Sequence, residues 1–161
     1  EGFIGITNQN KGWENNWIDC FLNLRIRPQI SKLKNNCLDI ETKNKVHEKI
    51  KSELRSHEPI NSFVHGDLWS GNIGIAQNGK GVIFDPASWW ADSEVDIAMT
   101  KLFGCFRSEF YEEYHKIIPT KKGFGNRMII YNFYHILNHA NMFGGSYYDQ
   151  VQDYAKRITS M

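Results

Sequence analysis

A change of hydrophobic pattern between residues 60 and 87 restricts the fold of this chain more than any other feature of its sequence. Three short apolar runs, Ser62–Val64, Ile73–Ala76 and Val82–Phe84, are separated there by glycine and asparagine turn signals. Such runs are too short for stable helices and are typical of brief strands around a loop. The sequence therefore predicts a small β-containing region between two helical regions.

Apolar residues on both sides of this region recur at helical spacing, as Val46, Ile50 and Leu54 do. The predicted helical segments lie within residues 13–33, 39–56, 93–103, 108–118, 126–143 and 147–158. Pro28 should end or kink the first of these helices near Arg27. The predicted fold class is α+β, mainly α-helical with a few short β-strands.

Length and composition exclude several classes of protein. The 161 residues suit one domain, and 19 basic against 18 acidic residues leave no basic block for a nucleic-acid surface. No apolar run approaches the roughly 20 residues of a membrane helix. Cys20, Cys37 and Cys105 are odd in number and form no CxxC pair, which favours reduced thiols in the cytoplasm.

Three oxygen-bearing side chains follow the predicted strands. Asp67 lies five residues before Asn72 in the run His65–Asn72, and Asp85 follows thirteen residues later, directly after a strand. Transfer of a phosphoryl group from ATP requires that an acceptor hydroxyl be aligned and that phosphate charge be neutralised by Mg²⁺. One carboxylate would act as base, and an amide and a second carboxylate would bind the metal. A lone Asp in a glycine-rich turn is usually a turn residue, but the joint spacing favours phosphoryl transfer.

The spacing resembles the catalytic loop of protein kinases, H-x-D-x-x-x-x-N, followed by a metal-binding Asp. Here that Asp begins Asp85-Pro86-Ala87 in place of Asp-Phe-Gly. This departure resembles the small-molecule kinases of the aminoglycoside phosphotransferase group, so we expect an acceptor other than a protein hydroxyl.

Three longer runs of sequence point to one family within this group. The runs His65-Gly-Asp-Leu-Trp-Ser-Gly-Asn72, Phe84-Asp-Pro-Ala-Ser88 and Glu94-Val-Asp-Ile-Ala98 resemble the fructosamine kinase (ketosamine-3-kinase) family, as does most of the chain. The resemblance implies ATP- and Mg²⁺-dependent phosphorylation of the 3-hydroxyl of a ketosamine, either small or protein-linked. The phosphorylated adduct is unstable, which implies a role in deglycation.

The same resemblance assigns roles to individual residues. It implies that Asp67 is the catalytic base and that Asn72 and Asp85 bind the metal. Trp69 and Trp89 are candidates for the wall of the substrate pocket, because an indole face can cover the C–H surface of a sugar. For Trp69 a core position is the equal alternative, and of Trp89 and Trp90 at most one should point inward.

Two residues are candidates for supporting roles. His65 would tie the loop to neighbouring backbone. Asp96 would either brace the loop from behind or act only as a capping or solvent-facing carboxylate.

Two further motifs have simpler interpretations. Gly74–Lys80 fits the spacing of a phosphate-binding P-loop, but Gly81 replaces the Ser or Thr that holds magnesium, so Gln77–Gly81 is predicted to be a hairpin turn. His135 and His139 lie four residues apart on a predicted helix, but no third zinc ligand is evident.

The family resemblance also predicts the domain organisation. It implies an N-terminal lobe with an ATP-contacting lysine and its glutamate partner, which have no counterpart in residues 1–161. We therefore expect the chain to form a single protein-kinase-like C-terminal lobe that would be inactive alone. The alternatives are another small-molecule kinase, acting on an aminoglycoside, choline or homoserine, and a non-catalytic binding fragment.

Overall fold

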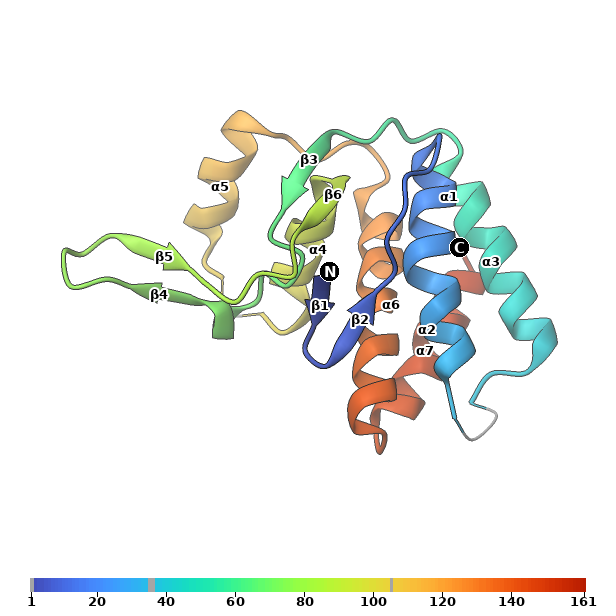
Figure 1. Ribbon diagram of the computed structural model, residues 1–161. Coiled ribbons are helices and arrows are strands. Elements are labelled where there is room, and N and C mark those ends of the chain that lie inside the picture. The colour runs from blue at the N-terminus through green and yellow to red at the C-terminus, as the bar shows by residue number, and fades with distance from the viewer. Residues whose placement is uncertain (1, 35–36, 105) are drawn as a thin grey trace.

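A computed structural model describes residues 2–34, 37–104 and 106–161 and shows a helical body that carries three two-stranded antiparallel sheets (Figure 1). The helices are α1 (Trp17–Phe21), α2 (Arg27–Lys32), α3 (Ile40–Leu54), α4 (Glu94–Leu102), α5 (Ser108–Ile117), α6 (Phe124–Phe143) and α7 (Tyr147–Thr159), with a π-helical turn η1 (Leu22–Ile26) and a 3₁₀ turn η2 (Ser70–Asn72). The strands are β1 (Gly2–Ile4), β2 (Thr7–Gln9), β3 (Asn61–Val64), β4 (Ile73–Ile75), β5 (Gly81–Ile83) and β6 (Trp89–Asp92). Strands pair as β1–β2, β3–β6 and β4–β5. The predicted α+β class is confirmed.

Pro28 does not end the first helical segment. The π-helical turn η1 precedes it, and Pro28 lies in the first turn of α2, so the wider π turn comes directly before the residue that lacks an N–H. The chain therefore remains helical from Trp17 to Lys32, with a change of helix type at the place where the sequence predicts a kink.

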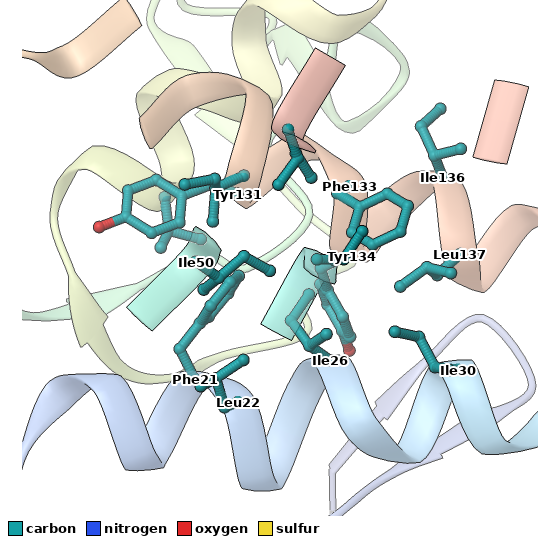
Figure 2. Packing of buried hydrophobic residues seen from close by; sticks show 14 of the residues in the cluster. Phe21, Leu22, Ile26, Ile30, Ile50, Tyr131, Phe133, Tyr134, Ile136 and Leu137 are labelled. Carbon is teal, nitrogen blue, oxygen red and sulfur yellow. The ribbon is translucent and has the colours of Figure 1, made fainter. Parts of the chain in front are cut away.

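The core forms where α6 crosses the α1–η1–α2 segment and α3 (Figure 2). Phe21 and Ile26 point from the N-terminal helices towards Tyr131 and Phe133 of α6, and Ile50 of α3 lies beside them. Full burial of each such side chain contributes roughly 1.5–3 kcal/mol. This packing provides the stable body on which the strands and loops are positioned.

Buried and exposed side chains alternate along β3 and β6, and the buried ones pack these strands against the helical body. Val64 and Trp89 are paired in the register and buried, whereas Phe63 and Trp90 are paired and exposed. The sequence did not predict β6, and its pairing with β3 places the residues after Val64 beside those before Trp89. The predicted active-site loop and the segment after Asp85 therefore meet.

The β4–β5 hairpin extends away from the body (Figure 1). Its turn is closed by hydrogen bonds from Ala76 N to the Lys80 oxygen (2.8 Å) and from Gly79 N to the Ala76 oxygen (2.9 Å). The predicted hairpin turn is confirmed, and β5 follows the P-loop-like spacing where a true P-loop requires a helix.

The described cysteines are not paired with each other. Cys20 and Cys37 are free thiols, and burial raises the pKa of both, whereas Cys105 lies outside the described residues. Among the helices of the described ranges, none is long and apolar enough to cross a membrane.

Candidate active site

The loop after β3 crosses the segment after Asp85 in close backbone contact. Ala87 N donates to the His65 oxygen at 2.9 Å. Gly66 has a positive φ of 82°, and a Cβ atom at this position would lie 2.3 Å from the Ala87 oxygen. Only glycine fits this crossing, because any other residue would have to push two backbone segments apart.

Asp96 holds the same loop from behind. It lies in the first turn of α4 and accepts hydrogen bonds from His65 N at 2.7 Å and from Gly66 N at 2.8 Å. Burial raises the pKa of the Asp96 carboxyl, and these two N–H groups partly oppose that shift. Of the two alternatives from the sequence, the position behind the loop is the one that the structure shows.

The His65 ring ties the loop to the end of β5. Its Nδ1 accepts from Asp67 N at 3.3 Å, and its Nε2 lies 3.0 Å from the Phe84 oxygen. Because a carbonyl oxygen can only accept, the proton of the neutral ring is on Nε2. The ring thus connects the start of the loop to the residue before Asp85.

The side-chain amide of Asn72 joins Asp67 to Asp85. Asn72 Nδ2 donates to the Asp67 backbone oxygen (2.9 Å), to Asp67 Oδ2 (3.2 Å) and to the Asp85 backbone oxygen (3.4 Å). Burial raises the pKa of Asp67, an effect opposed by the Asn72 hydrogen bond and by the nearby His139 and His65 and reinforced by Asp85. A carboxylate in this setting can accept a proton from a bound hydroxyl group.

Asn72 and Asp85 have the chemistry of a magnesium site. The Asn72 amide nitrogen is engaged, which leaves its oxygen for a cation, and the Asp85 side chain is exposed beside it. Amide and carboxylate oxygens are hard ligands that suit Mg²⁺. Asp85 has a φ of 55° and is the one non-glycine residue of the described ranges with a positive φ, a conformation that costs on the order of 1 kcal/mol. The residues present therefore fit the metal that the family resemblance implies.

Aromatic side chains from three distant segments gather beside this group. The Trp69 indole lies over Gly71, where a Cβ atom would come within 2.2 Å of the ring. Trp69 meets the edge of Phe103 at a centroid distance of 5.9 Å, Phe103 meets His139 at 5.5 Å, and His139 stacks on Tyr147 at 5.0 Å. We call Trp69, Phe103, His139 and Tyr147 the aromatic cluster.

Sequence reasoning missed three members of the aromatic cluster. Phe103, His139 and Tyr147 follow α4, lie on α6 and begin α7, and the fold brings them to Trp69 from far along the chain. His139 Nδ1 lies 2.7 Å from the His135 oxygen, so Nδ1 carries a proton and Nε2 remains for other contacts. The periodicity of α6 identifies the helix but does not show which loop one of its faces meets.

Trp89 packs against side chains of the N-terminal helices. Its ring stacks on Trp17 at 5.7 Å and lies under the Arg25 guanidinium, whose Cζ is 3.9 Å from the ring centroid. Trp89 is 9% exposed and Trp90 is 57% exposed. The ring contacts of Trp89 are therefore with Trp17 and Arg25, and its assignment to the substrate pocket stays a prediction.

The histidine pair on α6 does not belong to a group of described residues close enough together to hold a metal. His135 is fully buried, burial lowers its pKa to about 3, and neither ring nitrogen has a hydrogen-bond partner in the described structure. The group of described residues close enough for a metal is instead His57, Asp92 and Glu94.

That second group is already satisfied by internal contacts. Asp92 accepts from His57 (2.6 Å) and from the Tyr131 hydroxyl (2.7 Å), and Glu94 is paired with Arg127 (2.6 and 2.8 Å). These contacts support a structural role at the junction of β6 and α4.

Comparisons with known proteins agree with this geometry. The family model described as "Fructosamine kinase" matches residues 1–161. The chain is 44% identical over 154 residues to a "Probable ketoamine kinase" of Synechocystis sp., covering 96% of this chain and 52% of that protein. It is 37% identical over 146 residues to the ketosamine-3-kinase of Mus musculus, covering 89% of this chain and 47% of that protein.

A solved structure shows the same fold. The crystal structure of a "Putative fructosamine-3-kinase" from Haemophilus somnus superposes with a TM-score of 0.85 at 30% identity, covering 97% of this chain and 54% of that one. The kinase-like fold of these proteins is therefore the fold of this chain. The chain spans about half the length of the curated relatives that it matches.

Proposed function

Since the chain belongs to the fructosamine kinase family, we propose that it forms the acceptor- and metal-binding half of a kinase that transfers the γ-phosphoryl group of ATP to the 3-hydroxyl of a ketosamine. The observation that carries the proposal is the Asn72 amide, which joins the Asp67 carboxylate to the Asp85 backbone. This contact links a proton acceptor to a metal site, the two functions that phosphoryl transfer requires.

Asp67 orients the acceptor hydroxyl and takes its proton. Burial raises its pKa, which makes the carboxylate a better proton acceptor than an exposed Asp. The Asn72 hydrogen bond holds Oδ2 in place, and the other carboxylate oxygen is available to the acceptor.

Asn72 and Asp85 would hold Mg²⁺, which would neutralise phosphate charge. The Asn72 amide oxygen and the Asp85 carboxylate are the two ligands that this chain supplies. Asp85 has a positive φ, and its backbone oxygen accepts from the Asn72 amide.

The aromatic cluster binds the ketosamine beside Asp67. A ketosamine combines a sugar, whose C–H faces pack on aromatic rings, with an amine that is cationic when protonated and is attracted to ring faces. Trp69 is 37% exposed and comes from the same loop as Asp67, so a ligand on its indole lies next to the base.

His65 and Asp96 act as positioning residues. Asp96 fixes the backbone of the loop through two N–H groups, and the His65 ring connects Asp67 N to the Phe84 oxygen. In this proposal neither the His65 nor the Asp96 side chain contacts the substrate.

A segment swap tests the proposal. The 154 matched residues of the Synechocystis relative are replaced by this chain, and we call the product the swapped protein. With MgATP it should phosphorylate fructosyl-lysine or ribulosyl-lysine at the 3-hydroxyl, which NMR of the product identifies. The product should then break down and release the free amine, as deglycation requires.

Two outcomes would favour the alternatives. Transfer to an aminoglycoside or choline with none to a ketosamine would indicate another small-molecule kinase. Ketosamine binding without phosphate transfer by a folded swapped protein, with the unmodified relative active, would indicate a non-catalytic binding fragment.

A further inference from the structure

Asp92 lies at the end of the β3–β6 pair that is opposite to the loop after β3. It is the last residue of β6, it is paired with Asn61 at the start of β3, and it is fully buried. Its Oδ1 accepts hydrogen bonds from Ile60 N at 3.3 Å and from Glu94 N at 3.4 Å, and its Oδ2 accepts from the Tyr131 hydroxyl at 2.7 Å. One carboxylate thus joins the start of β3, the start of α4 and α6.

The remaining partner of Asp92 is His57, whose side chain is also buried. His57 Nε2 lies 2.6 Å from Asp92 Oδ2, and because a carboxylate oxygen accepts, the ring donates from Nε2. Burial raises the pKa of the Tyr131 hydroxyl well above its ordinary value, and Asp92 reinforces the shift, so this hydroxyl stays a donor. Both oxygens of the Asp92 carboxylate are therefore held by hydrogen bonds from two donors each.

The neighbouring buried carboxylate, Glu94, has different partners. It accepts from the Arg127 guanidinium at 2.6 and 2.8 Å and from Lys121 N at 2.9 Å. Within the described ranges, none of its hydrogen bonds reaches β3. Asp92 is therefore the carboxylate that links the strand leading into the loop to the helix that carries Asp96.

The first route from Asp92 to the loop follows the backbone. The loop begins at His65, directly after β3, and α4 begins two residues after Asp92 and carries Asp96 in its first turn. The Asp96 carboxylate accepts from His65 N at 2.7 Å and from Gly66 N at 2.8 Å. Because β3 has four residues at about 3.3 Å each, Asp92 lies roughly 13 Å from the loop, too far to touch a bound acceptor.

A second route passes through aromatic side chains. The Tyr131 hydroxyl, which donates to Asp92, accepts from Trp17 Nε1 at 3.1 Å. The Trp17 ring stacks on Trp89 at 5.7 Å, and Trp89 Cδ1 lies 3.2 Å from the place where a Cβ atom of Gly66 would be. Both routes from Asp92 therefore end at Gly66, where the two backbone segments cross.

We propose that Asp92 is a positioning residue for phosphoryl transfer at Asp67. It fixes the starts of β3 and α4, and thereby the place of Gly66 and of the base that follows it. A misplacement of about 1 Å can cost roughly 10²-fold in rate, so a remote carboxylate can govern turnover without touching the substrate. The inference rests on the proposed function for its effect on turnover, whereas its effect on the loop is measured without turnover.

Amide hydrogen exchange in the chain alone (residues 1–161) tests the effect on the loop. Asp92→Asn keeps the shape of the side chain but replaces one oxygen by an NH₂ group, so two donors lose their acceptor. Val46→Ala, at a fully buried position of α3, is the control for a general loss of stability. With urea added to bring both variants to the same free energy of unfolding, the amides of His65 and Gly66 should exchange at least about tenfold faster in Asp92→Asn. Equal exchange rates in the two variants would overturn the proposal.

Turnover of the swapped protein tests the effect on the reaction. Asp92→Asn should lower kcat for a ketosamine at least about tenfold, because the base is displaced. KM for the ketosamine should change less than about threefold, because two members of the aromatic cluster lie on α6 and α7. Val46→Ala should leave kcat within about twofold of the parent. An unchanged kcat in a folded Asp92→Asn protein would show that Asp92 supports stability alone.

Tyr131→Phe is the milder variant and carries both tests if Asp92→Asn does not fold. It removes one donor to Asp92 and the link to Trp17 but keeps the buried ring. Exchange at Gly66 should again be faster than in Val46→Ala, and in the double variant with Asp92→Asn the two losses in kcat should be less than additive, because both interrupt one network. A Tyr131→Phe protein that matches Val46→Ala in both measurements, or fully additive losses, would contradict the proposal.

The two measurements separate this inference from the proposed function. If the unmodified swapped protein folds but transfers no phosphate to a ketosamine, the proposed function fails. The exchange rates of His65 and Gly66 then decide whether Asp92 holds the loop.

Discussion

The active-site loop (residues 65–72) and the hairpin that follows it (residues 73–84) differ sharply in how they are held. The loop is bound by the Asp96 carboxylate, by the crossing with Ala87 and by the His65 ring. The hairpin is paired with itself, and its apolar side chains Ile75 (81%) and Ile83 (63%) are exposed.

The two parts of the candidate site are therefore held in place by different contacts. Asp67 is positioned by α4 and the core behind it, whereas Asp85 follows the hairpin and adopts an unusual backbone conformation. Functional groups on rigid elements are held more precisely than those on loops. The proposed base, Asp67, should therefore depend on buried contacts, and the proposed metal ligand, Asp85, should depend on its own charge.

The largest expected effect comes from removing the support of the loop. Asp96→Ala leaves His65 N and Gly66 N buried without an acceptor, which should lower the free energy of unfolding of the chain by about 4 kcal/mol. Urea unfolding followed by circular dichroism measures the loss. Glu113→Ala, at an exposed ion pair, is the control and should change the stability little. A loss below about 1 kcal/mol for Asp96→Ala would show that the loop is held in another way.

Asp85→Asn separates charge from backbone geometry. Asn tolerates a positive φ as Asp does, so the fold should be kept while the proposed metal ligand loses its charge. In the swapped protein, the Mg²⁺ concentration for half-maximal turnover should rise at least about tenfold, or about 1.4 kcal/mol. Asp149→Asn, an exposed carboxylate on α7, should leave the magnesium titration unchanged. An unchanged titration for Asp85→Asn would remove it as a ligand.

The raised pKa of Asp67 predicts a pH dependence of stability in the chain alone. The folded chain holds the Asp67 proton more tightly than the unfolded chain, so stability should fall as pH rises from the unfolded pKa, near 3.8, through the raised folded pKa. Asp67→Asn should flatten this part of the profile and be the more stable form at pH 7. Superimposable pH profiles of unfolding for the parent and the variant would contradict the burial of this carboxylate.

The smallest effect is expected in the hairpin. Ile75→Thr keeps a β-branched side chain at an exposed position and should change the stability of the chain alone by less than about 0.5 kcal/mol. The same urea titration provides the comparison with Asp96→Ala. A loss near that of Asp96→Ala would mean that the hairpin, too, is packed on the body.

Local sequence signals predicted part of the candidate site and one of the hairpins. The spacing of Asp67, Asn72 and Asp85 predicted their proximity, and glycine and asparagine signals predicted the β4–β5 hairpin. In each case the partners lie close along the chain, so turn chemistry determines much of the geometry.

Features that depend on distant pairing were not predictable in the same way. The strand β6 exists because it pairs with β3, more than twenty residues earlier, and the burial of Trp89 follows from Trp17 and Arg25 packing against it. The aromatic cluster likewise requires α6 to lie against the loop. Such contacts are decided by tertiary packing, which local propensity does not report.

Turnover of Asp67→Asn in the swapped protein tests the central claim most directly. The variant keeps the hydrogen bond from Asn72 and the shape of the site but removes the proton acceptor, so phosphate transfer to a ketosamine should fall at least about 10²-fold while the protein stays folded. A folded Asp67→Asn protein that phosphorylates the ketosamine at a near-normal rate would contradict the account.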